Sequence, residues 1–299
     1  MQLRRYSSLV AVAAASVLFL SGCVDNSASG GASTPANDFG VTVDETLAAA
    51  VPADIADSGK LVIGMDNTYP PNEFKDDAGQ PTGWGVDLAN AIATKLGLTA
   101  DIAVSKFDNI IPSVEGGKYN LGISSFTDTV EREQRVDFVN YYTAGVLWAS
   151  AKGKSVDPDN ACGLKVAVQA TTYQDTEELP AKNQACLDAG KPAIEVLRYD
   201  TQQDATNAVI LGKADALSAD SPVTLFAIAQ SKDKLQSAGK TFDVAPYGIV
   251  VAKNSELVPL VQQALQALID DGSYLKILSK WGVQDGAVTM ADVNAASKG

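Results

Sequence analysis

The chain has 299 residues and contains no histidine. A Ser-His-Asp catalytic relay is therefore excluded, because its general base is missing. Three cysteines without histidine cannot form an ordinary zinc site, so we predict neither a metal nor another cofactor. The stretch Ser124–Arg132, "SSFTDTVER", still places hydroxyl groups beside charged residues. It could hold a serine that a lysine activates, or it could bind an anion.

Basic residues are also scarce. The chain has 23 lysines and arginines against 36 aspartates and glutamates, a formal net charge of −13. Proteins that bind nucleic acid carry clusters of basic residues for the phosphates. We therefore expect no nucleic-acid partner, and we attribute the acidity to solubility.

Long apolar runs are rare as well. The run Leu9–Leu20 has 12 residues, fewer than the roughly 20 that a membrane-spanning helix needs. It follows Arg4 and Arg5, a pattern typical of an export signal. It ends in "LSGC", which resembles a bacterial lipobox, so we predict a lipoprotein signal peptide at residues 1–22 and lipidation of Cys23. Acyl chains on this cysteine would anchor the mature protein to the cell membrane, outside the cytoplasm.

The residues that follow the signal predict a linker and a disulfide. Val24–Gly40 is rich in Ser, Gly, Ala and Asn and has no periodic apolar face, so we predict a flexible tether over residues 23–54. The two remaining cysteines are Cys162 and Cys186. Since an exported protein meets oxidising conditions, we predict a disulfide between them, with two free buried thiols as the alternative.

From Ile55 onward, strand-like and helix-like segments alternate. "KLVIGM" is typical of a buried strand, and "GVDLANAIATKLGL" has the apolar spacing of a helix that ends at Gly97. This alternation predicts a mainly parallel sheet with a ligand crevice at the carboxyl ends of its strands. The pattern restarts after Ala151. We therefore predict two α/β lobes, with lobe 1 at residues 55–143 and 247–299 and lobe 2 at residues 146–244.

The serine pair of "SSFTDTVER" lies at the carboxyl end of a predicted strand. Asp128, with Glu131 three residues later, resembles a helix N-cap with its capping-box glutamate. Free N–H groups of a helix start beside Arg132 would favour a carboxylate. An α-amino acid also needs a counter-charge for its ammonium group. Asp220, at the end of a predicted strand of the second lobe, is a suitable residue.

Several segments between Lys60 and Gly282 resemble a known family. They are, in order, "LVIGMDNTYPPNEFKDDAGQPTGWGVDLANAIATKLG", "FDNIIPSVEGGKYNLGISSFTDTVEREQRVDF", "LKVAVQATTYQDT", "GKADALSADSPV", "YGIVVAKNSEL" and "DGSYLKILSKWG". The chain resembles the periplasmic or lipid-anchored solute-binding proteins of bacterial ABC transporters for polar amino acids, the group of the histidine-, lysine/arginine/ornithine- and glutamine-binding proteins. The resemblance implies a periplasmic-binding-protein-like α/β fold of type II, with two lobes joined by two crossing strands.

The resemblance also implies a ligand site between the lobes. Arg132 would clamp the α-carboxylate of an amino acid, and Asp220 would bind its α-ammonium group. Tyr69 and Phe107 would sandwich the ligand, while Asp66 would face its side chain. The other ligand-binding positions that the resemblance implies are Ser124, Ser125, Thr127, Gln169, Thr172 and Tyr173.

Each of these positions has a simpler explanation if the residues are taken alone. Tyr69 and Phe107 could be ordinary core aromatics. Asp66 could cap a turn, and Gln169 could be a solvated strand end. Arg132 could be one more charge on a solvated surface.

The chain departs from the usual family pattern at two positions. Asn72 stands where the family usually has an aromatic residue, and Gly85 stands where it commonly has an acid. Both departures leave the predicted fold intact. They weaken any transfer of ligand identity from the family.

We predict a monomeric receptor that captures a free polar amino acid and delivers it to the permease subunits of an ABC transporter. Amide or cationic side chains are favoured, because the pocket segments contain no second arginine and Asp66 would repel a carboxylate. One alternative is a dehydratase on the same fold, with Asp66 or Glu73 as general acid. Another is a ligand-presenting sensor subunit, which differs only in its partner.

Overall fold

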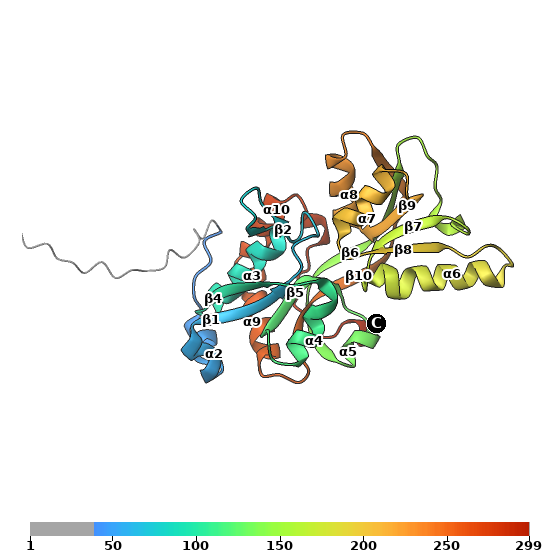
Figure 1. Ribbon diagram of the computed structural model, residues 1–299. Coiled ribbons are helices and arrows are strands. Elements are labelled where there is room, and N and C mark those ends of the chain that lie inside the picture. Colours follow the sequence, from blue (N-terminus) through green and yellow to red (C-terminus); the bar gives the residue numbers. More distant parts are fainter. Residues whose placement is uncertain (1–38, 299) are drawn as a thin grey trace, which may run out of the picture. The chain divides into compact units, whose positions relative to one another are not determined.

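The computed structural model describes residues 39–298 (Figure 1). The predicted signal peptide at residues 1–22, the predicted lipidation site Cys23 and residues 24–38 of the predicted tether lie outside the described residues. In the part of the chain that is described, no helix is long and apolar enough to cross a membrane.

An eight-stranded sheet with the order β4-β1-β5-β10-β6-β9-β7-β8 runs through the protein. Its strands are β1 (Lys60–Met65), β4 (Thr99–Val104), β5 (Leu121–Thr127), β6 (Val136–Ala151), β7 (Lys165–Gln169), β8 (Glu195–Tyr199), β9 (Ala216–Asp220) and β10 (Leu235–Ala252). β1 is parallel to β4 and β5, and β7 is parallel to β8 and β9. The long strands β6 and β10 are antiparallel to each other and connect these two groups.

The two long strands divide the described chain into two lobes (Figure 1). We call lobe 1 the part with β1, β4 and β5, and lobe 2 the part with β7, β8 and β9. The pairing of β6 with β10 is irregular between Ala238 and Phe242 and between Phe242 and Ala245. Gly145 lies opposite this region, where a Cβ atom would come within 2.5 Å of Thr241 Cγ2. The predicted fold class, two α/β lobes joined by two crossing strands, is confirmed.

Lobe 1 covers both faces of its strands with helices. These are α1 (Glu45–Ala49), α2 (Ala53–Ser58), α3 (Trp84–Lys95), α4 (Ile110–Glu115), α5 (Val130–Glu133), α9 (Leu257–Asp270) and α10 (Ser273–Lys280), beside a small hairpin of β2 (Phe74–Lys75) and β3 (Pro81–Thr82). Leu61, Ile63 and Met65 alternate along β1 and pack in the same core as α3 and α9, while Val62 packs with α4 on the other face. A continuous apolar strand of this kind fits a sheet that is buried on both faces.

Lobe 2 has the same layered construction. Its helices are a π-helical turn at Gln174–Glu178, α6 (Leu179–Asp188), α7 (Gln202–Ile210) and α8 (Ser221–Gln230). Val166 and Val168 of β7 pack with α6, whereas Ala167 packs with α7 and α8. Helices on both faces of a parallel sheet leave the carboxyl ends of the strands open for a ligand.

The predicted tether is too long. Residues 39–54 belong to the folded body: α1 begins after its N-cap Asp44, whose side chain accepts hydrogen bonds from Thr46 N and Leu47 N. Val41, Leu47 and Val51 are buried in the core that also contains α3 and α9. The composition of the segment suggested a linker because its apolar residues are few, but three of these few are buried in the core.

The predicted disulfide between Cys162 and Cys186 is confirmed. It closes a loop with a sequence separation of 24 and ties the segment before β7 to the buried face of α6. Closing a loop of this length stabilises the folded state by very roughly 3 kcal/mol in the chain-entropy account.

We predict that Leu47→Ala lowers the free energy of unfolding by about 2 to 4 kcal/mol, the usual range for a buried leucine. The reason is that Leu47 is 7% exposed in the lobe 1 core. Chemical denaturation followed by circular dichroism measures the change. Leu211→Ala is the matched control, because Leu211 is 68% exposed and its truncation should cost less than about 0.5 kcal/mol. Equal stabilities of the two variants would mean that α1 does not belong to the folded body.

Candidate functional site

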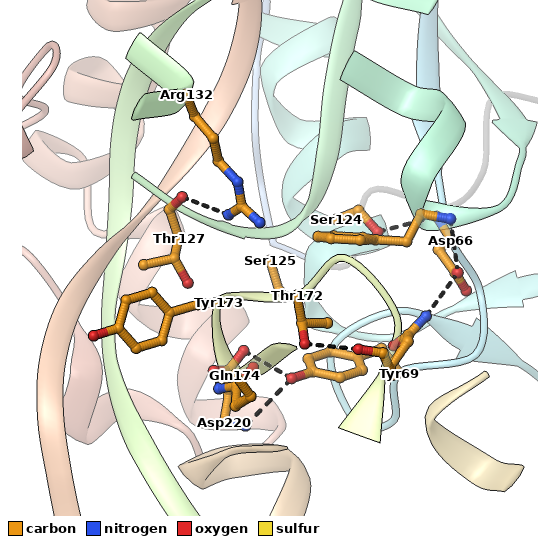
Figure 2. A pocket seen from close by; sticks show the side chains of 12 residues that line it. Asp66, Tyr69, Ser124, Ser125, Thr127, Arg132, Thr172, Tyr173, Gln174 and Asp220 are labelled. Carbon is orange, nitrogen blue, oxygen red and sulfur yellow. Dashed lines mark hydrogen bonds between the residues drawn. The ribbon is translucent and has the colours of Figure 1, made fainter. Parts of the chain in front are cut away.

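A small cavity lies between the lobes at the carboxyl ends of the strands (Figure 2). All the predicted ligand-binding residues line it, together with one that was not predicted, Gln174. The lining residues are Asp66, Tyr69, Phe107, Ser124, Ser125, Thr127, Arg132, Gln169, Thr172, Tyr173, Gln174 and Asp220. Thr127, Gln169 and Asp220 end strands and Asp66 directly follows one, which explains why segments far apart in the sequence meet here.

Asp66 follows β1 and both of its carboxylate oxygens accept hydrogen bonds. Thr68 donates to Oδ1 from its N–H at 2.9 Å and from its hydroxyl at 2.7 Å. Phe107 N–H at 3.1 Å and Gln169 Nε2 at 3.0 Å donate to Oδ2. Asp66 therefore caps a turn and also lines the cavity, so its two explanations are compatible. Burial raises the pKa of this carboxyl group, although the hydrogen bonds oppose the shift.

Ser124 and Ser125 lie within the buried strand β5, which ends two residues later at Thr127. The Ser124 hydroxyl accepts a hydrogen bond from Asp66 N–H at 3.0 Å, which ties β5 to β1. Ser125 has a φ of 52°, in the left-handed region that residues with a Cβ atom rarely adopt. Its N–H donates to the Tyr141 hydroxyl at 3.2 Å. This backbone conformation persists because buried partners on several elements hold Ser125 in place.

Arg132 is half-buried and bridges the lobes. One guanidinium nitrogen donates to Thr127 O in lobe 1 at 2.8 Å, and the other donates to Thr171 O in lobe 2 at 2.9 Å. The guanidinium carbon lies 5.9 Å from the centre of the Phe107 ring and 5.8 Å from that of Phe126. Burial lowers the pKa of Arg132 to about 10, so the guanidinium remains charged at neutral pH.

The predicted capping box beside Arg132 is wrong. The N-cap of α5 is Thr129, whose hydroxyl accepts from Arg132 N–H at 3.2 Å. Asp128 instead accepts hydrogen bonds from Asn140 Nδ2 and Ala295 N–H, each at 2.9 Å, and so holds the C-terminal segment against lobe 1. The group at this corner that could bind an anion is therefore the guanidinium of Arg132 rather than the start of a helix.

Asp220 ends β9 in lobe 2 and is 7% exposed. Tyr69 OH of lobe 1 donates to Oδ2 at 2.8 Å, and Gln174 Nε2 donates to Oδ1 at 2.7 Å (Figure 2). Burial raises the pKa of Asp220, while Tyr247, Gln174, Tyr69 and Arg132 oppose the rise. Gln174 follows the predicted pair Thr172–Tyr173 in sequence, and only the π-helical turn that starts there directs its amide toward Asp220.

The aromatic residues of the site are not isolated core residues. Phe107 is half-buried and stacks on Phe126 with ring centres 4.3 Å apart. Tyr69 is buried in an apolar cluster made otherwise by lobe 2, although it belongs to lobe 1. Both rings present a face or an edge to the cavity, where a flat ligand group could stack.

Direct contacts between the lobes hold the cavity in a closed form. They are Tyr69 with Asp220, Asp66 with Gln169 and Arg132 with Thr171, and at the surface an ion pair of Lys106 with Asp200 at 2.7 Å. Each of the first three contacts involves a group that a bound zwitterion would also need. A ligand that binds here would therefore replace these contacts between the lobes with contacts of its own to each lobe.

Around the cavity, acidic side chains outnumber basic ones. Asp66 and Asp220 line the cavity, and Glu73 lies directly behind Ser125 with a fully buried side chain. Arg132 is the cation among the lining residues. In the described part of the chain there is no group of residues that could hold a metal ion. The site thus offers one fixed positive charge and an excess of acidic groups.

Two α/β lobes with a charged cavity at their strand ends define a receptor for a small zwitterionic molecule. Comparison with known proteins identifies the family. The model of the bacterial extracellular solute-binding proteins, family 3, matches residues 61–284, and the chain belongs to this family. It is a substrate-binding protein for an amino acid, works with an ABC transporter and is located outside the cytoplasm.

Three similar proteins illustrate the relationship. Arginine-binding protein ArgT of Corynebacterium glutamicum is 40% identical over 250 residues, which cover 83% of this chain and 82% of the relative. The structure of an ancestral arginine-binding protein bound to arginine is 34% identical and has a TM-score of 0.69, over 75% of this chain and 98% of the other. AncCDT-1, an ancestral amino acid-binding protein and precursor of cyclohexadienyl dehydratase, is 32% identical with a TM-score of 0.65, over 76% and 97% of the two chains.

Proposed function

We propose that the protein binds L-arginine between its lobes and delivers it to the ABC transporter permease. The observation that carries the proposal is the charge pattern of the cavity. Arg132 and Asp220 can neutralise the two charged main-chain groups of an amino acid, and the acidic groups Asp66 and Glu73 are then left without a cation. A cationic side chain supplies the missing charge.

Arg132 and its neighbours suit an α-carboxylate. The guanidinium offers two parallel donors to a carboxylate, a geometry that a lysine cannot match. Thr127 and Thr172 line the same cavity and carry hydroxyl groups that can add hydrogen bonds. Asp220, on the opposite lobe, suits the α-ammonium group. A ligand held in this way joins lobe 1 to lobe 2 through its own two charges.

The rest of the cavity suits a guanidinium group. Asp66 can accept from its N–H groups, and Gln169 lies beside Asp66 to orient them. Phe107 and Tyr69 offer aromatic surfaces on which a planar cation stacks. The names of two relatives, ArgT and the ancestral arginine-binding protein, support the same choice.

Closure of the lobes follows from where the contacts are. Because the carboxylate is held by lobe 1 and the ammonium by lobe 2, the closed form gains contacts that the open form lacks. Moving the population from 1:99 to 99:1 in favour of closure requires about 5.5 kcal/mol of such differential binding. Two charge pairs together with an aromatic sandwich are sufficient for this amount.

We further infer that the protein is not an enzyme. Asp66 already accepts four hydrogen bonds, so it has no free direction in which to donate a proton to a leaving group. Glu73 lies behind Ser125 and does not line the cavity. A dehydratase would need one of these acids in contact with its substrate. Copurification with a permease rather than with a kinase would separate the transport role from that of a sensor subunit.

The attachment to the membrane is also part of the proposal. The sequence "LSGC" supports lipidation of Cys23, and a lipid anchor would keep the monomeric receptor close to its permease. Mass spectrometry of the protein extracted from membranes tests for lipid on Cys23. In a second experiment, a Cys23→Ala variant should be released in soluble form.

Isothermal titration calorimetry with L-arginine, L-glutamine and L-cystine tests the choice of ligand. We expect arginine to bind most tightly, because it alone adds a cationic side chain. Tighter binding of glutamine or cystine would contradict the arginine proposal. No binding of any of the three would contradict the whole assignment of the site.

We predict that Arg132→Ala raises the Kd for arginine at least ~30-fold, because removing one partner of a buried charge pair costs about 2 to 5 kcal/mol. Arg132→Lys should lie between the wild type and the alanine variant, since lysine keeps the charge and loses the paired donors. Arg135→Ala is the matched control: Arg135 is exposed and pairs with Glu115, outside the cavity. A similar loss of affinity in both alanine variants would refute the role of Arg132.

A further inference from the structure

Glu73 is a buried acid that lies behind the cavity and is not among its lining residues. Its side chain has no exposed surface. Both carboxylate oxygens lie 3.1 Å from the Ser125 hydroxyl, which is their hydrogen-bond partner among the described residues. No lysine or arginine pairs with Glu73 in the described part of the chain. A carboxylate in such surroundings is unstable as an anion unless a cation comes close.

The hydroxyl of Ser125 has two partners in addition to the cavity. Asn72 Nδ2 donates to Oγ at 2.9 Å, and Asn72 Oδ1 in turn accepts from Trp84 Nε1 at 2.8 Å. The amide of Asn72 is therefore fixed with its NH₂ group toward Ser125. One lone pair of the hydroxyl oxygen is always used by Asn72. Its proton and its second lone pair are shared between Glu73 and the cavity.

The protonation state of Glu73 then decides what Ser125 offers to a ligand. When Glu73 is ionised, the Ser125 proton points to Glu73, and the free lone pair faces the cavity as an acceptor. When Glu73 is neutral, it can donate to Ser125, whose own proton is then free to face the cavity as a donor. An acceptor suits a cationic N–H group, and a donor suits a carbonyl or carboxylate oxygen.

The two departures from the usual family pattern are both in contact with this pair of residues. Asn72 supplies the fixed bond to Ser125. A Cβ atom on Gly85 would lie 2.2 Å from Glu73 Oε1, so any side chain at position 85 would displace the carboxyl group. The glycine at position 85 therefore leaves room for the Glu73 carboxyl group behind Ser125.

The titratable groups that face Glu73 come from several elements. Asp66, which follows β1, and Asp220, at the end of β9, repel the ionised form of Glu73. The hydroxyl groups of Tyr69 and of Tyr141 in β6 interact electrostatically with Glu73. Burial, followed by repulsion from the two aspartates, raises the pKa of Glu73 well above its ordinary value. The raised pKa favours the neutral form of Glu73 in the empty cavity. A cationic ligand offsets the repulsion and favours its ionised form.

We propose that Glu73 determines the specificity of the site by giving up its proton to solvent when a cationic amino acid enters, which turns the Ser125 hydroxyl into an acceptor. This inference rests on the proposed function as an arginine receptor. In the reaction, the O–H bond of Glu73 breaks, the proton passes to the buffer, and the Ser125 proton rotates toward the new carboxylate. The charge gained at Glu73 offsets the charge that the ligand side chain brings.

Calorimetry of arginine binding between pH 6 and pH 8, in buffers with different heats of ionisation, tests the inference. Because binding releases a proton, the affinity of the wild type should rise with pH, by up to about tenfold per unit for one proton. Glu73→Gln cannot release that proton, so its profile should be flatter and its arginine affinity lower. Asp101→Asn is the matched control: Asp101 is a surface acid that pairs with Lys60, far from the cavity residues, and this variant should release the proton as the wild type does.

A second variant keeps the experiment decisive if Glu73→Gln does not fold. Gly85→Ala retains the acid but displaces it, so it should also reduce the number of protons released. Arginine binding by the wild type without proton release, or with equal release by Glu73→Gln, would refute the inference and leave the proposed function intact. Failure of the wild type to bind arginine would refute both.

Discussion

The cost of burying charge is the constraint on which the structure of this site depends. Asp66, Asp220 and Glu73 are withdrawn from water, and Arg132 is the cation that lines the same cavity. Each buried charge is stable only with a partner. In the empty closed form the partners are hydrogen-bond donors from the opposite lobe, such as Tyr69 for Asp220. In the function that we propose, a ligand with three charges, two positive and one negative, replaces these donors and corrects the excess of acid.

The fold provides this arrangement because parallel strands end together. Asp66 follows β1, Thr127 ends β5, Gln169 ends β7 and Asp220 ends β9. Two of these strands belong to each lobe, so the polar residues face one another across the gap. The crossing strands β6 and β10 connect the two lobes and so hold these strand ends opposite one another. The pairing of β6 with β10 is irregular where they pass between the lobes. Small changes in this irregular segment can move one lobe without disturbing either core.

Much of the fold and of the site could be predicted from the sequence. The strands and helices were recognisable because a buried parallel sheet gives short apolar runs and its helices give a spacing of three and four residues. The cavity residues were found because strand ends and family motifs coincide. Asp128 was misassigned as a cap because its partners, Asn140 and Ala295, are distant in sequence. Gln174 was missed for the same kind of reason, since a π-helical turn directs it.

The tether was overestimated because composition alone does not reveal which few apolar residues are buried. Leu47 and Val51 stand among alanines and acids, yet both pack into the core. Asn72 and Gly85 could be recognised in the sequence as departures, but not explained. Their meaning depends on Glu73, which lies next to Asn72 in the chain and contacts Gly85 only through the fold.

The central claim is that the cavity selects its ligand by the positive charge of the side chain. A calorimetric comparison of L-arginine with L-citrulline tests it most directly, because citrulline has nearly the same shape and an uncharged end group. Hydrogen bonds to charged groups contribute about 1.5 to 3 kcal/mol, so arginine should bind roughly 10- to 100-fold more tightly. Equal affinities, or a preference for citrulline, would contradict the claim.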